Sequence, residues 1–339
     1  MTDQTPTNAL DSDLDRIVAG STAVLPHWGC IDAQGPEAEA FLQSQLTNDV
    51  AAIAPDGVGI GGYCTPKGRL LATFLLARSP QGFRMLCSRD VLPPTAKRLS
   101  MFVLRAKLKI VDRAEHIAVL GAHGEAAPAA LAELGFDPPA PGQASWRDDA
   151  CLLGLPPVDI GGRRVGRWLL AAPGEEISAA SVQLERRLAP VSADVDRWLE
   201  VLSGVPRITE ATREAYVPQM INYELVDGVG FRKGCYPGQE IVARTQYLGK
   251  LKRRMFGARL ATRPADEAAW APGAPVMADG AADPVGSVVL SAPAPDGGVV
   301  LLVEYRMQEA ADSILRVGGE PLVATELPYP LPNAAALPR

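Results

Sequence analysis

The residues best suited to chemistry lie in one short segment around a single cysteine. Cys235 stands within the run KGCYPGQE at residues 233–240. The glycines of this run let the backbone turn tightly and approach a ligand closely, and Pro237 restricts the same turn. Arg232 and Lys233 directly precede the thiol. Neighbouring cations favour the thiolate, which is the form that attacks electrophiles and binds metals.

The cysteine count restricts what this thiol can do. The chain has five cysteines, and no two of them are spaced as a CxxC pair. An odd number without paired spacing argues against a disulfide framework and against a zinc site, so no metal site is expected. An iron–sulfur cluster needs about four protein thiolates. Any cluster chemistry at Cys235 is therefore transient, shared with a partner, or redox in nature.

The same segment also has a purely structural interpretation. A Gly/Pro turn between domains can enclose a buried cysteine, and a basic run is often only a solvated face. The motif is followed by the cations Arg244, Lys250, Lys252, Arg253 and Arg254. They give a local positive field in a chain whose net charge is −6. Spacing alone supports the functional and the structural interpretation about equally.

Three separate blocks of sequence together resemble the YgfZ family. They are FLQSQLTNDV at 41–50, YCTPKGR at 63–69, and the motif KGCYPGQE at 233–240, which PQMIN at 218–222 precedes. YgfZ proteins are a branch of the fold shared with the aminomethyltransferase of the glycine cleavage system. The resemblance extends over residues 25–325 and is weakest in the Ala/Pro-rich middle of the chain.

This resemblance implies an α+β fold, with glycine-cleavage T-protein-like folate-binding units around a central cavity and a small C-terminal β-barrel. We expect a disordered tail at 1–20, a first α+β unit at 21–115 and a second unit at 116–245 that ends in the motif. The barrel is expected at 246–326 and an irregular tail at 327–339.

The local sequence patterns are compatible with this architecture. Apolar residues at helical spacing predict a helix over 36–50. Three apolar runs separated by Gly/Pro turns, at 58–64, 70–77 and 83–87, predict an antiparallel meander. Beyond residue 250, short strand-like runs between Pro/Gly/Asp turns are typical of a small barrel. Further helices are expected at 94–104, 176–189 and 193–203, and further strands at 106–111, 117–121, 164–172, 253–260, 285–291, 297–305 and 313–317.

The resemblance implies tetrahydrofolate as the ligand. Its pterin carries a donor pair, N3–H and the 2-amino group, which a carboxylate accepts bidentately. Glu240 matches the acid of the family's motif and is expected in that role, with a surface carboxylate as the alternative. Tyr236 or Tyr223 either stacks on a folate ring or belongs to the core. The residues expected to bind folate are Lys233, Gly234, Tyr236, Gly238, Gln239, Glu240, Asn222 and Tyr223, with Arg244, Arg253 or Arg254 for its anionic tail.

Cys235 matches the family's motif cysteine and is the expected catalytic residue. The role that the resemblance implies is support of iron–sulfur enzymes, including a tRNA-thiolating one, by maintaining or repairing their clusters with folate. Three chemical steps stay open for the thiol. It can act as a redox partner, as an acceptor of a one-carbon unit, or as a transient ligand of iron.

Two other functions remain open. A folate-dependent aminomethyltransferase or demethylase needs a carboxylate beside N5 of folate, and Asp90 is the nearest candidate. A non-catalytic scaffold for RNA or protein would use the basic strip at 244–254, but the net charge of −6 and the lack of interleaved aromatic and basic residues argue against it, so direct nucleic-acid binding is not expected. The three histidines, His27, His116 and His123, are not spaced as metal ligands or as partners of the cysteine.

Composition indicates a globular protein of the cytoplasm. A chain of 339 residues, of which 47% are hydrophobic and 21% charged, fits two or three packed domains. The N-terminal residues are polar and acidic and lack the pattern of a targeting peptide. No apolar run approaches about 18 residues. We therefore expect no membrane span, a cytoplasmic location and reduced thiols.

Overall fold

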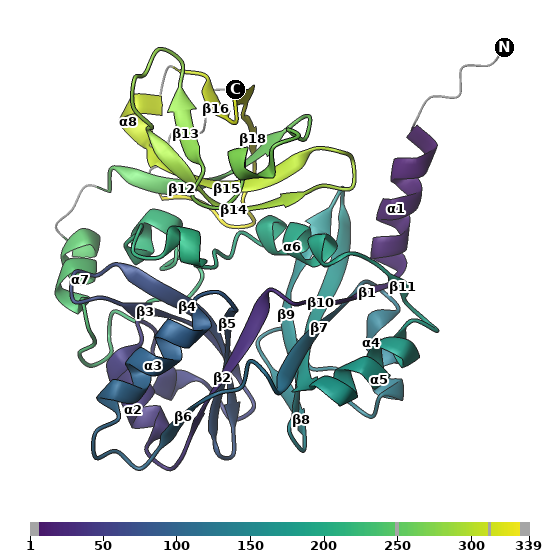
Figure 1. Cartoon of the computed structure of the whole chain (residues 1–339), viewed down its shortest axis with the longest axis vertical. Helices are drawn as coiled ribbons and strands as arrows, with labels where there is room; N and C mark the ends of the chain where they lie inside the picture. Colours follow the sequence, from purple (N-terminus) through teal and green to yellow (C-terminus); the bar gives the residue numbers. More distant parts are fainter. Residues whose placement is uncertain (1–6, 248–250, 311–312, 333–339) are drawn as a thin grey trace.

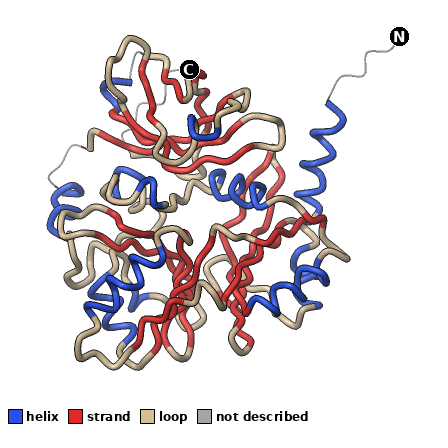
Figure 2. Tube along the Cα trace, in the orientation of Figure 1, coloured by secondary structure: helices blue, strands red, loops and turns tan. Residues whose placement is uncertain are grey.

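Three bodies surround a common centre in the computed structural model, which describes residues 7–247, 251–310 and 313–332. Two sheets with their helices form the lower half of the molecule, and a third body of strands lies above them (Figure 1). Helices lie on the outer sides of the two lower sheets, whose strands approach each other in the middle (Figure 2). Within the described residues, no helix has the length and apolar character that crossing a membrane requires.

The first body is a five-stranded sheet in the order β3-β4-β5-β2-β6. Its strands are β2 (Trp28–Gln34), β3 (Val58–Cys64), β4 (Leu70–Ser79), β5 (Gly82–Ser88) and β6 (Lys109–Asp112). Strands β3, β4 and β5 pair antiparallel in sequence order, so the predicted meander is confirmed. Helices α2 (Ala38–Gln45) and α3 (Leu92–Phe102) contribute Leu42 and Leu99 to one core with the sheet residues Phe74 and Met85.

The second body is a six-stranded sheet in the order β11-β1-β7-β10-β9-β8. Its strands are β1 (Ser21–Val24), β7 (Ile117–His123), β8 (Ala144–Arg147), β9 (Ala150–Ile160), β10 (Arg163–Pro173) and β11 (Ala189–Pro190), with helices α4 (Ala127–Glu133) and α5 (Gly174–Leu184). Strand β1 pairs with β7. The chain therefore enters the second sheet before it forms the first. Residues 21–24 were expected in the first unit, but this pairing places them in the second sheet.

The long strand β9 was not predicted because Pro156 and Pro157 interrupt its apolar pattern. Strand β8 pairs only with residues 150–153 of β9, so the prolines face no partner on that side. On the other side, the register with β10 shifts between Val165 and Arg167, opposite the prolines. An edge position and a bulge are the two places where a strand tolerates proline.

The third body is a seven-stranded sheet that curves into a nearly closed barrel, in the order β17-β16-β13-β14-β15-β12-β18. The strands are β12 (Arg253–Leu260), β13 (Pro275–Ala278), β14 (Gly286–Pro293), β15 (Val299–Arg306), β16 (Leu315–Val317), β17 (Glu320–Pro321) and β18 (Val323–Thr325). The barrel encloses its own core, which includes Phe256, Trp270, Leu301 and Tyr305. The strand-like runs after residue 250, which are typical of a small barrel, thus lie in a separate barrel-like body.

Helix α6 (Ala193–Leu202) connects the bodies, because it packs on β14 and β15 of the barrel and on β1 and β9 of the second sheet. Ser192 caps its N-terminus, since the Ser192 side chain accepts a hydrogen bond from the backbone N–H of Asp194. The remaining helical segments are α7 (Gln239–Tyr247), α8 (Met307–Ala310) and the short 3-10 helices η1 (Val50–Ala52), η2 (Glu210–Thr212), η3 (Pro218–Ile221) and η4 (Glu267–Ala269).

The expectation of a disordered N-terminal tail is wrong for residues 7–19, which form helix α1 (Thr7–Ala19). Ile17 and Val18 are buried in a core that also contains Trp198 of α6. Burial of these side chains stabilises a segment whose polar composition alone suggests fraying. Residues 1–6 and 333–339 lie outside the described residues, and residues 327–332 contain no helix or strand.

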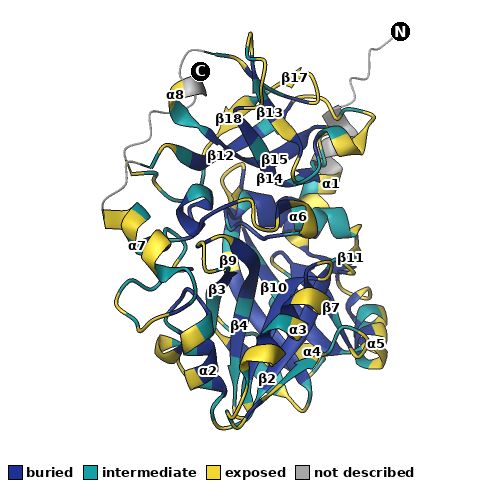
Figure 3. Cartoon of the chain, turned by 60° about the vertical axis from the view of Figure 1, so that its left-hand side comes forward, coloured by how far each residue is buried: buried dark blue, intermediate teal, exposed yellow. Residues whose placement is uncertain are grey.

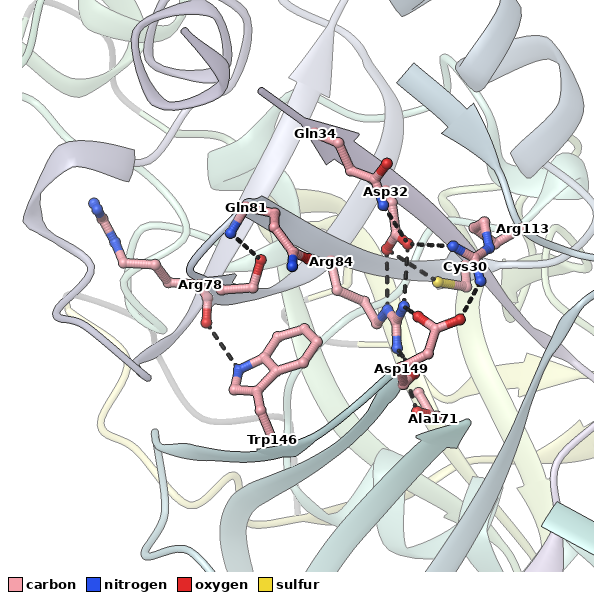
Figure 4. A network of polar contacts seen from close by, with 11 residues as sticks. Cys30, Asp32, Gln34, Arg78, Gln81, Arg84, Arg113, Trp146, Asp149 and Ala171 are labelled. Carbon is pink, nitrogen blue, oxygen red and sulfur yellow. Dashed lines mark hydrogen bonds and ion pairs between the residues drawn. The ribbon is translucent and has the colours of Figure 1, made fainter. Parts of the chain in front are cut away.

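A network of charged side chains joins the two lower sheets (Figure 4). On the first sheet, Asp32 of β2 accepts hydrogen bonds from Nε and Nη2 of Arg84 of β5, at 2.9 and 3.0 Å. Arg84 also donates to the carboxylate of Asp149, which lies in the turn between β8 and β9, at 2.7 Å. Arg113 contacts both Asp32 and Asp149. Each arginine thus bridges both carboxylates, and the network fixes the second sheet against the first.

Candidate functional site

The sequence blocks around Cys235 come together in the folded chain. The hydroxyl of Thr47 donates to the carbonyl of Gly228 at 2.5 Å and accepts from the backbone N–H of Gly62 at 2.8 Å. The N–H of Gly230 donates to the carbonyl of Thr47 at 2.8 Å. One threonine therefore ties the segment before the motif to the first sheet.

Lys233 fastens the motif loop to the same place. Its Nζ donates to the carbonyls of Leu46 and Asn48, at 2.7 and 2.6 Å, and lies 5.3 Å from the centre of the Tyr236 ring. Burial lowers the pKa of Lys233 to about 8, and the charge of Asp49 partly opposes that shift. The ammonium group predicted to contact folate is thus engaged by the protein's own backbone.

Two glycines allow the turn after Cys235 to pack on the block at 63–69. Gly238 has a φ of +83°, and a Cβ at this position would lie 2.5 Å from the Thr65 carbonyl oxygen and 2.6 Å from the Cα of Gly68. Side chains other than glycine rarely adopt this φ, and none fits so close to a backbone. Both blocks therefore need glycine where they meet, and α7 begins directly after this contact.

Cys235 is the exposed member of the five cysteines. It lies in the segment 231–238, which forms neither helix nor strand. The other four cysteines are buried, and burial raises the pKa of Cys64 and Cys151 to about 12. The structure thus separates one solvent-accessible thiol from four core thiols.

Asn222 and Tyr223 are buried and form hydrogen bonds to other parts of the chain. Asn222 has a φ of 59°, donates through Nδ2 to the Met255 carbonyl at 2.9 Å, and accepts from Nη1 of Arg254 at 2.9 Å. The hydroxyl of Tyr223 donates to the carbonyl of Gly61 at 3.0 Å. This pair joins the motif segment to the barrel on one side and to the first sheet on the other.

The other predicted ligand-binding residues do not converge on one point. Gly234 is exposed and Gln239 is half-buried. Glu240 and Arg244 both lie exposed on α7, one helical turn apart. Arg253 belongs to the barrel, where it pairs with Glu304. The second half of the motif is therefore a helix with a largely exposed surface, and the expected basic strip includes residues 248–250, which lie outside the described residues.

Two neighbouring hollows lie between the three bodies. The outer cleft has a volume of about 680 Å³ and is lined by the first sheet, α6 and the barrel; Asp90 and Trp270 belong to this lining. The inner cavity has a volume of about 50 Å³ and a mostly apolar lining. Glu200 and Arg207 line both hollows, so this pair stands at their junction.

Of the residues predicted to bind folate, Tyr223 alone lines one of these two hollows. Cys235 and Glu240 line neither of them. The inner cavity instead presents Trp28, Phe74 and Arg167, which no sequence motif singled out. The accessible thiol and the central hollows are thus two separate sites.

The Glu200–Arg207 pair is buried and forms a two-pronged ion pair. Nε of Arg207 lies 2.7 Å from one carboxylate oxygen of Glu200, and Nη2 lies 2.9 Å from the other. The guanidinium carbon of Arg207 lies 4.8 Å from the centre of the Trp28 ring. The pair fixes both a carboxylate and an aromatic ring at the junction of the hollows.

A second polar cluster lies beside it, where Asp196 stands between two histidines. Nε2 of His123 lies 3.0 Å from one oxygen of Asp196, and Nε2 of His27 lies 3.7 Å from the other. Burial acts to raise the pKa of Asp196, but the hydrogen bond and charge of His123 and the charge of Arg167 outweigh it and lower the pKa to about 2. These residues are far apart in sequence, so no spacing could have revealed the cluster.

Several buried nitrogens around the hollows lack a hydrogen-bond partner among the described residues. They are Nε1 of Trp28, Nε of Arg167 and both ring nitrogens of His27. A buried polar group left unpaired costs about 1–3 kcal/mol. Such groups therefore mark positions where a ligand or ordered water supplies the missing partners. Within the described part of the chain, no three His, Cys, Asp or Glu side chains are arranged to hold a metal ion.

Comparison with known sequences identifies the family, although no family model matches the chain. The tRNA-modifying protein YgfZ of Edwardsiella ictaluri is 30% identical over 328 residues, which cover 90% of this chain and 91% of that protein. The chain belongs to the YgfZ family. The YgfZ protein of Colwellia psychrerythraea is 31% identical over 239 residues, covering 68% of this chain and 69% of its own.

The YgfZ fold expected here is confirmed by a solved structure. The aminomethyltransferase T of the glycine cleavage system from Bartonella henselae superposes with a TM-score of 0.69, covering 95% of this chain and 90% of its own. Sequence identity in this pair is 17%, so the likeness concerns the fold alone. The T-protein-like arrangement with a C-terminal barrel, predicted from the YgfZ resemblance, is therefore correct.

The environment of His27 predicts a pH-dependent stability. Burial, together with the charges of Arg207 and Arg197, lowers the pKa of His27 from 6.5 to about 4, although Glu200 and Asp196 oppose the shift. Because the folded pKa is the lower one, protonation favours the unfolded chain. The neutral His27 therefore contributes to the free energy of unfolding in full above pH 6.5. This contribution, about 3 kcal/mol, is lost as the pH falls towards 4.

Urea unfolding of wild type and of His27→Gln between pH 7 and pH 4 measures this effect. The variant should lose less unfolding free energy on acidification than the wild type. His116→Gln is the matched control because His116 is exposed, and its profile should run parallel to that of the wild type. Parallel profiles for all three proteins would contradict the assignment of a buried neutral His27.

Proposed function

We propose that this protein binds tetrahydrofolate at the junction of the two central hollows and supports iron–sulfur enzymes through Cys235. The observation that carries the proposal is the division of the thiols into one exposed cysteine on a fastened loop and four in the core. The relatives are named tRNA-modifying proteins, and we extend this role to the present chain. The enzymes it supports then include iron–sulfur enzymes that modify tRNA.

The outer cleft has the size of a reduced-folate site, and the inner cavity beside it offers aromatic and polar contacts. The outer cleft of about 680 Å³ lies within the range of about 300–1,000 Å³ that is typical of small-molecule sites. Trp28, Phe74 and Tyr223 offer aromatic surface to a flat ring. The unpaired nitrogens of Trp28 and Arg167 can donate to the acceptor atoms of a pterin. The inner cavity of about 50 Å³ admits only part of such a ring.

Glu200 is the carboxylate best placed to accept the donor pair of the pterin. It lies at the junction of both hollows, and each of its oxygens accepts one bond from Arg207. A carboxylate oxygen has a second lone pair, which stays available to a ligand. Folate, when bound, supplies one-carbon units or reducing equivalents. Arg89 and Arg197 line the outer cleft and would attract its anionic tail.

The position of Cys235 favours chemistry on another macromolecule. The thiol is exposed and lines neither hollow, so a ligand held at Glu200 does not meet it directly. Thiol–disulfide exchange with a partner and transient ligation of a partner's iron both need such an accessible thiol. Accepting a one-carbon unit from folate needs the thiol beside the bound ligand. The separation therefore supports the first two roles over the third.

A folate-dependent aminomethyltransferase or demethylase remains the second candidate function. Asp90 lines the outer cleft and accepts a hydrogen bond from the backbone N–H of Glu210 at 3.0 Å through one oxygen. A carboxylate in that position can assist proton transfer to a bound one-carbon carrier. On this account Cys235 has no part in the reaction, so the two candidates differ in what its substitution does.

The choice of carboxylate can be tested with two isosteric variants. Glu200→Gln should weaken the binding of 5-formyltetrahydrofolate by about 1–3 kcal/mol, the contribution of a hydrogen bond to a charged group. Glu240→Gln should leave the affinity unchanged, because Glu240 lies exposed on α7. Isothermal titration calorimetry measures both, with the urea midpoint of each variant as the control for folding. Loss of affinity in Glu240→Gln alone would instead mean that the pterin binds at the motif and not at Glu200.

The role of the thiol can be tested in cells that lack their own YgfZ protein. Cys235→Ser should fail to restore the activity of iron–sulfur enzymes, since serine supplies neither a redox-active group nor a soft metal ligand. Its affinity for 5-formyltetrahydrofolate should equal that of the wild type. Full restoration of enzyme activity at equal protein level would remove the thiol from the function and favour the transferase alternative.

A further inference from the structure

The segment from α3 to β6 concentrates positive charge in an acidic protein. Residues 91–111 contain five lysines and arginines and no aspartate or glutamate, in a chain of net charge −6. The cations are Lys97, Arg98, Arg105, Lys107 and Lys109. We call residues 97–109 the α3–β6 tip. It is part of the first body and lies on the side of the molecule away from the barrel (Figure 1).

The charges of the α3–β6 tip are not neutralised by the protein itself. Among the described residues, none of its five cations forms an ion pair with a carboxylate, whereas elsewhere Arg78 pairs with Glu39 and Arg259 with Asp296. Glu37 does contact the tip, but its carboxylate accepts from the backbone N–H of Lys107 at 2.7 Å. The positive charge therefore remains available to a partner.

Apolar side chains project between these cations. Met101 is 63% exposed, Phe102 is 43% exposed and Leu104 is 88% exposed. The end of α3 and the loop after it are accordingly part of the exposed surface (Figure 3). The guanidinium carbon of Arg98 lies 5.6 Å from the centre of the Phe102 ring. An aromatic ring beside an arginine is a surface on which unpaired bases stack.

The backbone holds the tip in place without a partner. Leu104 has a φ of 46°, which is rare for a leucine. The N–H of Ala106 donates to the Val103 carbonyl at 2.8 Å, and the N–H of Leu108 donates to the Ala106 carbonyl at 2.9 Å. Leu108 itself is buried. A surface that is already ordered loses little conformational entropy on binding.

The composition of the tip favours nucleic acid over an acidic protein. Three of its five cations are lysines, and lysine is depleted at protein–protein interfaces relative to other surfaces. Lysines without carboxylate partners suit phosphates, which supply most of the affinity for RNA. The Arg98–Phe102 pair adds a contact for bases. The expectation of no nucleic-acid binding rested on the net charge of the chain and on a lack of interleaved aromatic and basic residues, and neither describes this local surface.

We propose that the α3–β6 tip binds structured RNA of the tRNA class, with its lysines and arginines on phosphates and the Arg98–Phe102 pair on an unpaired base. The choice of tRNA rests on the proposed function, whereas the affinity for RNA rests on the tip alone. The tip adjoins the motif loop through a short series of contacts. Arg98 lies close to Tyr63, Tyr63 pairs with Leu46, and the carbonyl of Leu46 accepts from Lys233.

Fluorescence anisotropy with end-labelled, unfractionated bacterial tRNA and the full chain tests the proposal. The wild type should bind tRNA at 50 mM KCl, with an affinity that falls steeply towards 200 mM. Lys107→Gln/Lys109→Gln should weaken binding at least tenfold at 50 mM and reduce the slope of log affinity against log salt by about two. Phe102→Leu should weaken binding without changing that slope, because it removes stacking but no charge.

The matched control is Arg164→Gln/Arg186→Gln, which removes the same charge from exposed positions of the second body. It should change the affinity less than twofold. An equal loss in both double variants, or no binding of tRNA at 50 mM, would overturn the proposal. Equal lysine-dependent binding to phosphatidylglycerol vesicles would do so too, in favour of a membrane surface. Each of these failures leaves binding of 5-formyltetrahydrofolate intact, so it is distinguishable from failure of the proposed function.

Discussion

The site depends on the attachment of Lys233 to the first sheet. Its ammonium group donates to the carbonyls of Leu46 and Asn48, and its partly buried position lowers its pKa to about 8. Two residues further on, Cys235 faces solvent. The loop is held before the thiol by these hydrogen bonds and after it by the close contact of Gly238 with the turn at Gly68. The accessible thiol is therefore a fixed feature of the fold.

The central hollows obey a different constraint, namely the need to pair buried charges. Glu200 and Arg207 satisfy each other, and Asp196 is satisfied by His123, yet nitrogens of Trp28, Arg167 and His27 have no hydrogen-bond partner among the described residues. Tyr223 belongs to both regions. Its ring lines the inner cavity and packs against Gly228, whose carbonyl accepts from Thr47. A ligand in the inner cavity would therefore contact a residue that also supports the motif segment.

Sequence patterns predicted the parts of the fold that depend on local chemistry. The meander and the strand at 253–260 follow from apolar runs between turn residues, and they appear as β3–β5 and β12. The meeting of the motif with the earlier blocks was predictable only through the family resemblance. Strand β9 could not be predicted from the sequence, because its pairing in the sheet tolerates two prolines that a local strand pattern excludes. The cluster around Asp196 could not be predicted either, because its members become neighbours only when α6 packs on the second sheet.

In the proposed function, the fold presents Cys235 to partner proteins at a place apart from a ligand held in the hollows. The most direct test is the rate at which a 5-kDa maleimide–polyethylene glycol modifies the native protein, with and without saturating 5-formyltetrahydrofolate. One thiol should react rapidly, Cys235→Ser should abolish this reaction, and the ligand should leave its rate unchanged. Protection of Cys235 by the ligand, or slow modification comparable to that of the buried cysteines, would contradict this proposal.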